Sequence, residues 1–231
     1  MRRAPAAAWA LGAALVGAAA TPAAAHPHGT LDCAAQVQAG PGGVSGIALT
    51  LTLDAASSAA LQGRLQAQDD GSAPPTREAR LFADLVSGMF RQSGWMLKLQ
   101  PLDADGQPQA AALALADPVP ATWRRLADGR LQVAVQLRPE AAAGPAPASH
   151  RLACQDPDWY WATGFAEASQ FSVAPPCRAE LDAMGSLAEQ AQALQAQARR
   201  AGLPGADRVP DALLGTRDQR APGGTLHCPA G

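Results

Sequence analysis

Two of the four histidines in the chain, His26 and His28, stand one residue apart directly after a run of small residues. Ala23–Ala25 has the A-x-A pattern of a signal-peptidase cleavage site, so processing would make His26 the first residue. The His26 imidazole and the free α-amine would then supply two nitrogen ligands. Alternate residues of an extended segment share one side, which brings His28 and Asp32 near His26. The spacing therefore predicts a metal site made of His26, His28 and Asp32.

Nitrogen and carboxylate ligands of this kind suit Cu(II), Ni(II) or Zn(II), with copper bound most tightly by intrinsic order. A histidine in third place often binds Cu(II) or Ni(II) through deprotonated backbone amides, but Pro27 has no N–H to lose. The mode that stays open uses the α-amine and the His26 imidazole, completed by His28 or Asp32. The alternative interpretation is a frayed polar terminus with no ligand role.

The other two histidines, His150 and His227, are typical of surface or strand-end positions. His227 would approach the N-terminal segment if the last strand of the fold paired with it. The sequence contains no G-x-S-x-G, no P-loop and no H-E-x-x-H motif, so hydrolase and nucleotide-binding functions lack their usual groups. We therefore expect a binding protein rather than an enzyme.

The first 25 residues have the pattern of an export signal, with Arg2 and Arg3 before the apolar run Ala6–Ala20. This run is shorter than the roughly 20 residues that a membrane span needs. We expect residues 1–25 to be a removed signal peptide and residues 26–231 to be a single periplasmic domain. The mature chain is expected to have no membrane span.

The charge balance of the mature chain argues against nucleic-acid binding. The chain has 18 basic and 20 acidic residues, and removing Arg2 and Arg3 leaves a formal charge of −4. No block of basic residues is present to attract phosphates. We therefore expect no nucleic-acid partner.

Four cysteines remain in the mature chain, and none of them forms a C-x-x-C pair. An even number in an exported protein favours two disulfides over a zinc or redox motif. The favoured pairing is Cys177 with Cys228 and Cys33 with Cys154, although the other pairings stay open. A bridge that closes a loop of about 50 residues stabilises a fold by roughly 4 kcal/mol in the chain-entropy model.

The patterning along the chain predicts an α+β fold, with a mostly antiparallel β-sheet or sandwich and inserted helices. Residues 29–37 and 44–53 form a predicted hairpin, and Asp54 and Thr76 cap two predicted helices. The second helix, with apolar residues from Leu81 to Phe90 at three- and four-residue spacing, is expected to pack its apolar face on the sheet. Further strands are expected at residues 95–102, 131–137, 164–173 and 224–228, and in the segment that ends at Cys154.

An amphipathic helix is expected in the C-terminal part of the chain, at about residues 178–202. Leu181, Met184, Leu187 and Leu194 lie on one side of this predicted helix, and Gly202 ends it. It would be a helical insertion between Cys177 and Cys228.

Six segments resemble a family of exported bacterial proteins of unknown function, whose mature chains begin with His-Pro-His and have an aspartate four residues after the second histidine. The six segments occur in the same order as in that family, over nearly the whole mature chain. The segments are AHPHGTLDCAA, LTLDAASSAAL, DGRLQVAVQL, CQDPDWYW, APPCRAEL and TLHCP.

Members of that family are often described as the periplasmic component of an uncharacterised ABC-type transport system, associated with nickel, cobalt or zinc transport genes. The chain departs from the family pattern at Leu53-Asp54-Ala55, where the family has Phe-Asp-Glu, and at Asp69-Asp70-Gly71, a reduced form of a calcium-type loop. Calcium binding is therefore not implied here. The positions that the resemblance carries over are His26, His28, Asp32, Asp54, Asp156, Cys177 and Cys228.

Three hypotheses about function follow from the sequence. The leading one is a periplasmic binding or accessory protein that captures Zn, Ni or Cu at its processed N-terminus and serves a membrane metal transporter. The second is a disulfide-linked protein-interaction module in which the histidines have no metal role. The third is a copper-dependent oxidative enzyme that uses an N-terminal histidine brace.

Overall fold

The computed structural model describes residues 29–40, 43–65, 76–109, 112–140, 149–156, 161–182 and 223–229. The predicted signal peptide, His26 and His28 lie outside these residues. The described chain forms two β-sheets and two α-helices, which agrees with the α+β class predicted from the sequence. Among the described helices, none is long and apolar enough to cross a membrane.

The larger sheet has seven strands, with β4, β6, β2, β1 and β8 in spatial order, β5 beside β6 and β9 beside β1. Strand β1 pairs in parallel with β8 and β9, whereas the other pairs of this sheet are antiparallel. Its strands are β1 (Gly29–Gly40), β2 (Gly43–Leu53), β4 (Leu115–Ala116), β5 (Thr122–Arg125), β6 (Leu131–Pro139), β8 (Trp161–Gly164) and β9 (Phe171–Val173).

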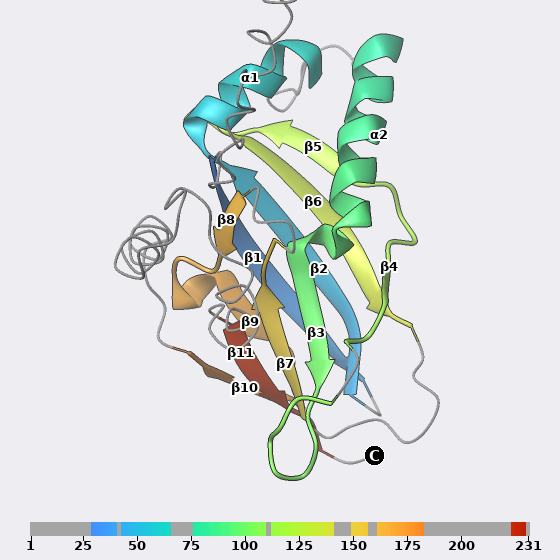
Figure 1. Cartoon of the computed structure of the whole chain (residues 1–231), viewed down its shortest axis with the longest axis vertical. Coiled ribbons are helices and arrows are strands. Elements are labelled where there is room, and N and C mark those ends of the chain that lie inside the picture. Colours follow the sequence, from blue (N-terminus) through green and yellow to red (C-terminus); the bar gives the residue numbers. More distant parts are fainter. Residues whose placement is uncertain are drawn as a thin grey trace, which may run out of the picture.

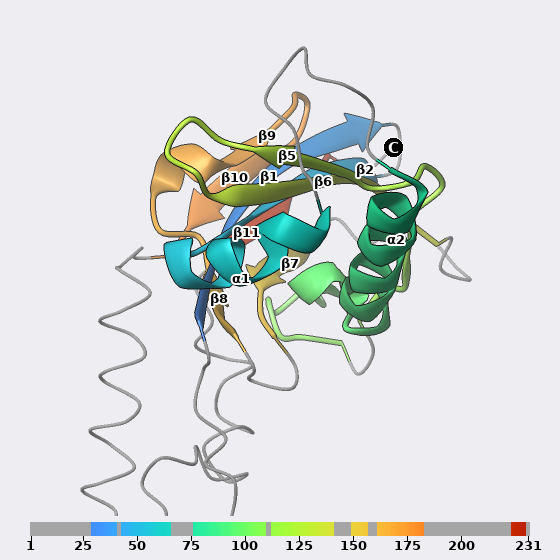
Figure 2. The same cartoon turned by 90° about the horizontal axis from the view of Figure 1, so that it is seen from above.

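The smaller sheet has four antiparallel strands in the order β10, β11, β7 and β3. It lies across one face of the larger sheet, and α1 (Ala55–Leu65) and α2 (Arg77–Gln92) lie together at one end of the molecule (Figure 1). Figure 2 shows both helices on the same side of β5 and β6. The strands of the smaller sheet are β3 (Leu97–Pro101), β7 (Ser149–Cys154), β10 (Arg178–Leu181) and β11 (Gly223–His227).

Alternating apolar residues explain why β1, β2 and β6 form the centre of the larger sheet. In β6, Leu131, Val133, Val135 and Leu137 are all at most 3% exposed, while the residues between them are more exposed. Side chains on one face of a strand recur every second residue, so this pattern buries one face and leaves the other for polar groups. The buried faces of both sheets share one core with Val86 and Phe90 of α2.

The predicted start of each helix is confirmed by its capping contact. Asp54 Oδ1 accepts a hydrogen bond from Ser57 N at 2.8 Å, and Thr76 Oγ1 accepts one from Ala79 N at 3.2 Å. Each contact satisfies one of the amides that the first turn of a helix leaves without a partner. Two short 3₁₀ helices, η1 (Gly94–Met96) and η2 (Ala168–Gln170), precede β3 and β9.

The expected helix at residues 178–202 is wrong at its beginning. Arg178–Leu181 form β10, which pairs with β11 in a register that joins Arg178 to His227 and Leu181 to Gly224. The Cys177–Cys228 disulfide stands directly beside this pairing and holds the two segments together. Long-range pairing therefore overrides the local amphipathic pattern in these four residues, and residues 183–202 lie outside the described chain.

Two predicted strands are shorter than expected. The segment 164–173 is divided into the end of β8, η2 and β9, and the segment 95–102 contributes only Leu97–Pro101 to a strand. Trp95 and Met96 have positive φ angles of 58° and 55°, which are incompatible with a β-strand. Both residues are nevertheless buried, so burial rather than strand pairing explains their apolar character.

The apolar face of α2 packs only in part, contrary to the expectation. Val86 and Phe90 are buried in the core, but Leu81, Leu85 and Met89 remain 58%, 61% and 62% exposed. The core therefore covers only one part of the apolar stripe of α2. The described fold leaves one side of this stripe open.

Candidate functional site

Strand β1 carries the one predicted metal ligand that lies within the described residues, Asp32. Leu31, Cys33 and Ala35 are buried, whereas Thr30 and Asp32 on the opposite face are partly exposed. Thr30 and Asp32 thus share a face, as strand alternation requires. The strand begins at Gly29, one residue after His28.

The beginning of β1 is held closely against α1 and β8. Thr30 N donates to Asp54 Oδ2 at 2.7 Å, and Gly29 pairs with Trp161 of β8. A Cβ atom at Gly29 would stand only 2.7 Å from Ser57 Oγ and 2.9 Å from the Trp161 ring, besides meeting the Asp54 carboxylate. Glycine is therefore the residue that fits this close approach.

Asp32 forms an ion pair with Arg130, whose Nη1 lies 3.3 Å from Asp32 Oδ2. Partial burial raises the pKa of the Asp32 carboxyl, and the nearby charge of Asp54 acts in the same direction. The charge and hydrogen bond of Arg130 work in the opposite direction but do not outweigh the burial. Asp32 is thus a partly desolvated carboxylate with one cationic neighbour.

Arg130 divides its guanidinium between two carboxylates. Its Nε lies 2.8 Å from Asp128 Oδ2. The backbone hydrogen bond from Arg130 N is the main cause that lowers the pKa of the exposed Asp128, and the side-chain contact adds to it. The turn that carries both residues contains Gly129 with a φ of 85°. This tight turn brings Arg130 to Asp32 across 98 positions of sequence.

The structure does not bring the described histidines to this site. The idea that the last strand joins the N-terminal segment is wrong, because β11 pairs with β10 and β7 in the smaller sheet. His227 Nδ1 lies 3.1 Å from Ser149 Oγ, and His150 is buried within the same sheet. Within the described ranges, no group of three or more His, Cys, Asp or Glu residues could hold a metal ion. Of the three predicted ligands, Asp32 is the one that lies within the described residues.

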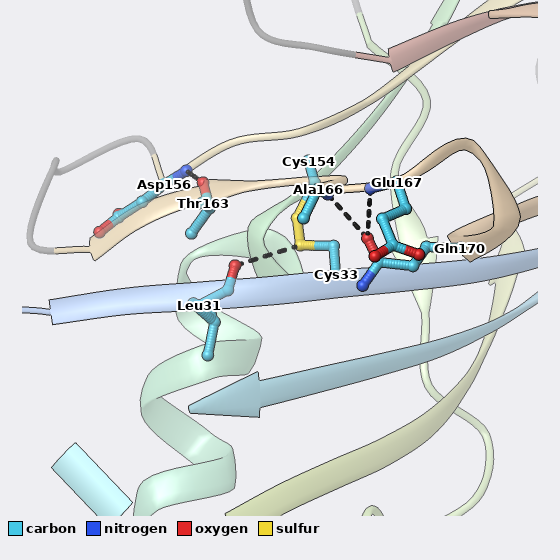
Figure 3. The surroundings of a disulfide bond; sticks show 8 residues. All are labelled: Leu31, Cys33, Cys154, Asp156, Thr163, Ala166, Glu167 and Gln170. Carbon is cyan, nitrogen blue, oxygen red and sulfur yellow. Dashed lines mark hydrogen bonds between the residues drawn. A yellow bond between two sulfur atoms is a disulfide. The ribbon is translucent and has the colours of Figure 1, made fainter. Parts of the chain in front are cut away.

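Two disulfides fix the frame around these residues. Cys33 of β1 is bonded to Cys154 of β7, with their Cα atoms 6.5 Å apart, and this bond joins the two sheets (Figure 3). Cys177 is bonded to Cys228 with a Cα separation of 4.2 Å. This is the pairing that the sequence favoured. The first bond lies one residue from Asp32, so it also restrains the strand that carries the predicted ligand.

Asp156 lies close behind the first disulfide and organises the entry into β8. Asp156 N donates to Thr163 Oγ1 at 2.8 Å (Figure 3). Asp156 Oδ2 accepts a hydrogen bond from Trp161 N at 2.7 Å. The side chain is almost fully buried, at 1% exposure. The family resemblance singled out Asp156, and in the described structure this residue stabilises the loop before β8.

Sequence reasoning missed an apolar groove between α1 and α2. It has a volume of about 620 Å³ and is lined mainly by apolar side chains, together with Ser57, Ser93 and Asp156. The wide apolar stripe of α2 was the sequence feature that could have indicated the groove. The sequence pattern does not show, however, that part of this stripe stays exposed. The principal apolar lining residues are Leu61, Phe82, Leu85, Met89, Met96 and Trp161.

The geometry defines a disulfide-linked α+β protein with two sheets and an open groove between two helices. The chain belongs to the family described as "Protein of unknown function (DUF1007)", whose family model matches residues 11–209. No curated protein and no solved structure matches the chain. The match confirms that the chain belongs to a domain family of unknown function.

Proposed function

We propose that the mature protein captures a divalent transition metal, Cu(II), Ni(II) or Zn(II), at its processed N-terminus and delivers it to a membrane metal transporter. The observation that carries the proposal is the position of Asp32. This carboxylate is held on an anchored strand, four positions after His28 in the sequence and on the same strand face as Thr30. The proposal is one of capture and delivery in the periplasm, without catalysis.

The anchoring of β1 supports the proposal energetically. A flexible terminal segment loses conformational freedom when it closes around a metal ion, and that loss weakens binding. The hydrogen bond from Thr30 N to Asp54 and the disulfide of Cys33 restrain the chain on both sides of Asp32 before any ion arrives. Asp32 is therefore held in place without help from a metal ion.

The ligand chemistry predicts a characteristic pH dependence. The α-amine titrates at about 7.7–8.0 and an imidazole at about 6.5, so protons compete with the metal for both groups. The affinity should fall steeply below about pH 6. Delivery to a transporter is the role that the family resemblance implies, and the same pH sensitivity would favour release in an acidic compartment.

Calorimetric titration of the processed protein with Cu(II), Ni(II) and Zn(II) tests the proposal. We expect the His26→Ala/His28→Ala double variant to lose at least tenfold in affinity for the metal that binds best, because one to two nitrogen ligands are removed. His227→Ala is the matched control, since His227 lies in the smaller sheet away from β1. Equal affinities in the wild type and the double variant would overturn the proposal. Mass spectrometry of the exported protein tests whether His26 is its first residue, as the proposal requires.

A further inference from the structure

The groove between α1 and α2 follows from the unequal size of the side chains that the two helices turn toward it. The wall from α1 is built mostly of small residues, Ala56, Ser57 and Ala60, whereas α2 contributes long side chains such as Leu85 and Met89. Small side chains do not fill the space between two packed helices, and a volume of about 620 Å³ remains there. The sequence of α1 thus contributes to the groove as much as the apolar stripe of α2 does.

The inner surface of the groove belongs to the hydrophobic core. Val86 and Met96 line the groove and are 8% and 4% exposed, and both are members of the core cluster. Leu85 and Met89, at its outer side, are more than 60% exposed. A molecule in the groove would therefore reach from solvent down to the core and cover apolar surface that the fold leaves open.

The dimensions of the groove suit a small molecule with an apolar body. Its volume falls within the roughly 300–1,000 Å³ of typical ligand pockets. The lining residues of α2 extend from Phe82 to Phe90, a rise of about 12 Å along the helix. Methionine side chains such as Met89 adapt readily to a flexible ligand. An alkyl chain of medium length matches this space.

A cation stands at one end of the groove. Arg64, in the last turn of α1, follows Ala60 and Leu61 at the spacing of one helical turn and so extends the face of α1 that lines the groove. The guanidinium carbon of Arg64 lies 4.0 Å from the ring centroid of Phe82, another lining residue. The Arg64 side chain is exposed, and no ion pair joins it to another residue of the described ranges. It is therefore accessible to an anionic group.

Asp156 does not offset this positive charge for a ligand. It is the one ionisable side chain among the described lining residues, but it is 1% exposed and its Oδ2 accepts a hydrogen bond from Trp161 N at 2.7 Å. The charge that a ligand meets at the surface of the groove is that of Arg64. A molecule with an apolar body and one negative group complements this arrangement.

From this complementarity we propose that the groove binds a single-chain carboxylic acid, with its alkyl chain between α1 and α2 and its carboxylate on Arg64. A guanidinium can hold a carboxylate through two parallel hydrogen bonds, which fixes the orientation of the bound molecule. The inference goes beyond the proposed function and does not depend on it, because none of the proposed metal ligands lines the groove.

Calorimetric titration of the metal-free processed protein with decanoate and with decanol tests the inference, because these molecules share an alkyl chain and differ in charge. We expect decanoate to bind, and Arg64→Gln to lower its affinity about fivefold, the upper end of the range for an exposed ion pair. The affinity for decanol should stay the same in this variant. Arg80→Gln is the matched control, since Arg80 is an exposed arginine of α2 that does not line the groove. It should leave both affinities unchanged.

A second variant tests the place of the alkyl chain. Leu85→Asn/Met89→Asn should weaken the binding of both molecules at least about tenfold, because apolar contact surface is lost. Both residues are more than 60% exposed, so the substitutions should leave the core intact. Leu81→Asn should have no effect on binding, because Leu81 lies on the same stripe at 58% exposure but does not line the groove.

Four results would overturn the inference. The first is the absence of saturable decanoate binding, and the second is an unchanged affinity in the Leu85→Asn/Met89→Asn variant. The third is an equal loss of decanoate and decanol binding in Arg64→Gln, which would mean that Arg64 only supports the Phe82 ring. The fourth is a concentration-dependent dimer of the wild type that the double variant does not form, since a second copy of the chain would then cover the groove.

Discussion

Arg130 Nη1 lies 3.3 Å from Asp32 Oδ2, although 98 positions separate the two residues in the sequence. The turn before β6 carries Arg130 across the exposed face of the sheet to the beginning of β1. The predicted metal ligand therefore has a cation as its present neighbour. A divalent ion at Asp32 would have to compete with this guanidinium or displace it.

Removing this competitor should strengthen metal binding. We expect Arg130→Gln to raise the affinity about two- to fivefold, because an ion pair with partly exposed partners is worth about 0.5–1 kcal/mol. Arg138→Gln, at an exposed position of β6, should leave the affinity unchanged. Calorimetric titration of both variants with Cu(II) measures the effect. A weaker affinity in Arg130→Gln would instead mean that Arg130 holds Asp32 in its binding position.

Asp54 links the start of β1 to the first turn of α1 through both of its carboxylate oxygens. We expect Asp54→Ala to lower the free energy of unfolding by about 1–2 kcal/mol, since a helix cap and a strand contact are lost together. It should also remove the protection of the Thr30 amide from hydrogen exchange. Guanidinium unfolding and exchange measured by NMR report the two effects separately.

Thr76→Ala provides the comparison for this second effect. It removes the cap of α2 and should cost about 1 kcal/mol, but it should leave the Thr30 amide protected. Unchanged Thr30 protection in Asp54→Ala would show that the strand pairing alone anchors the beginning of β1.

His150 should make the stability of the fold sensitive to acid. Its side chain is 3% exposed, and burial lowers its pKa below the 6.5 of an ordinary histidine. Among the described residues its Nδ1 has no hydrogen-bond partner. The unfolded chain therefore binds a proton more readily than the folded chain, so stability is complete above pH 6.5 and declines as the pH falls below it.

The decline due to His150 cannot exceed about 1.4 kcal/mol per pH unit, the value for one proton. Unfolding by guanidinium at pH 7.5 and pH 5.0 measures it. His150→Leu should lose less stability between these two values than the wild type, while His227→Gln, at a position whose side chain is 31% exposed, should behave as the wild type does. An equal loss in His150→Leu and the wild type would assign the acid sensitivity to other groups.

Local sequence patterns determined the central hairpin, the two helix starts and the α+β class. The alternation in β2 and β6 and the caps Asp54 and Thr76 act over a few residues, so they can be read without knowledge of the fold. The pattern at Arg178–Leu181 was misleading, because pairing with a strand more than 40 residues away decides its conformation. Local propensity is too weak to prevail against such pairing and a neighbouring disulfide.

For the candidate site, too, some features could be predicted from the sequence and others could not. The sequence by itself identified the candidate ligands, since His26, His28 and Asp32 are proposed from residue type and spacing alone. Only the tertiary structure decided that Asp32 contacts Arg130 and that Leu85 and Met89 border an open groove. Contacts between distant segments depend on how sheets and helices pack, and a periodic pattern records that a face is apolar but not what will cover it.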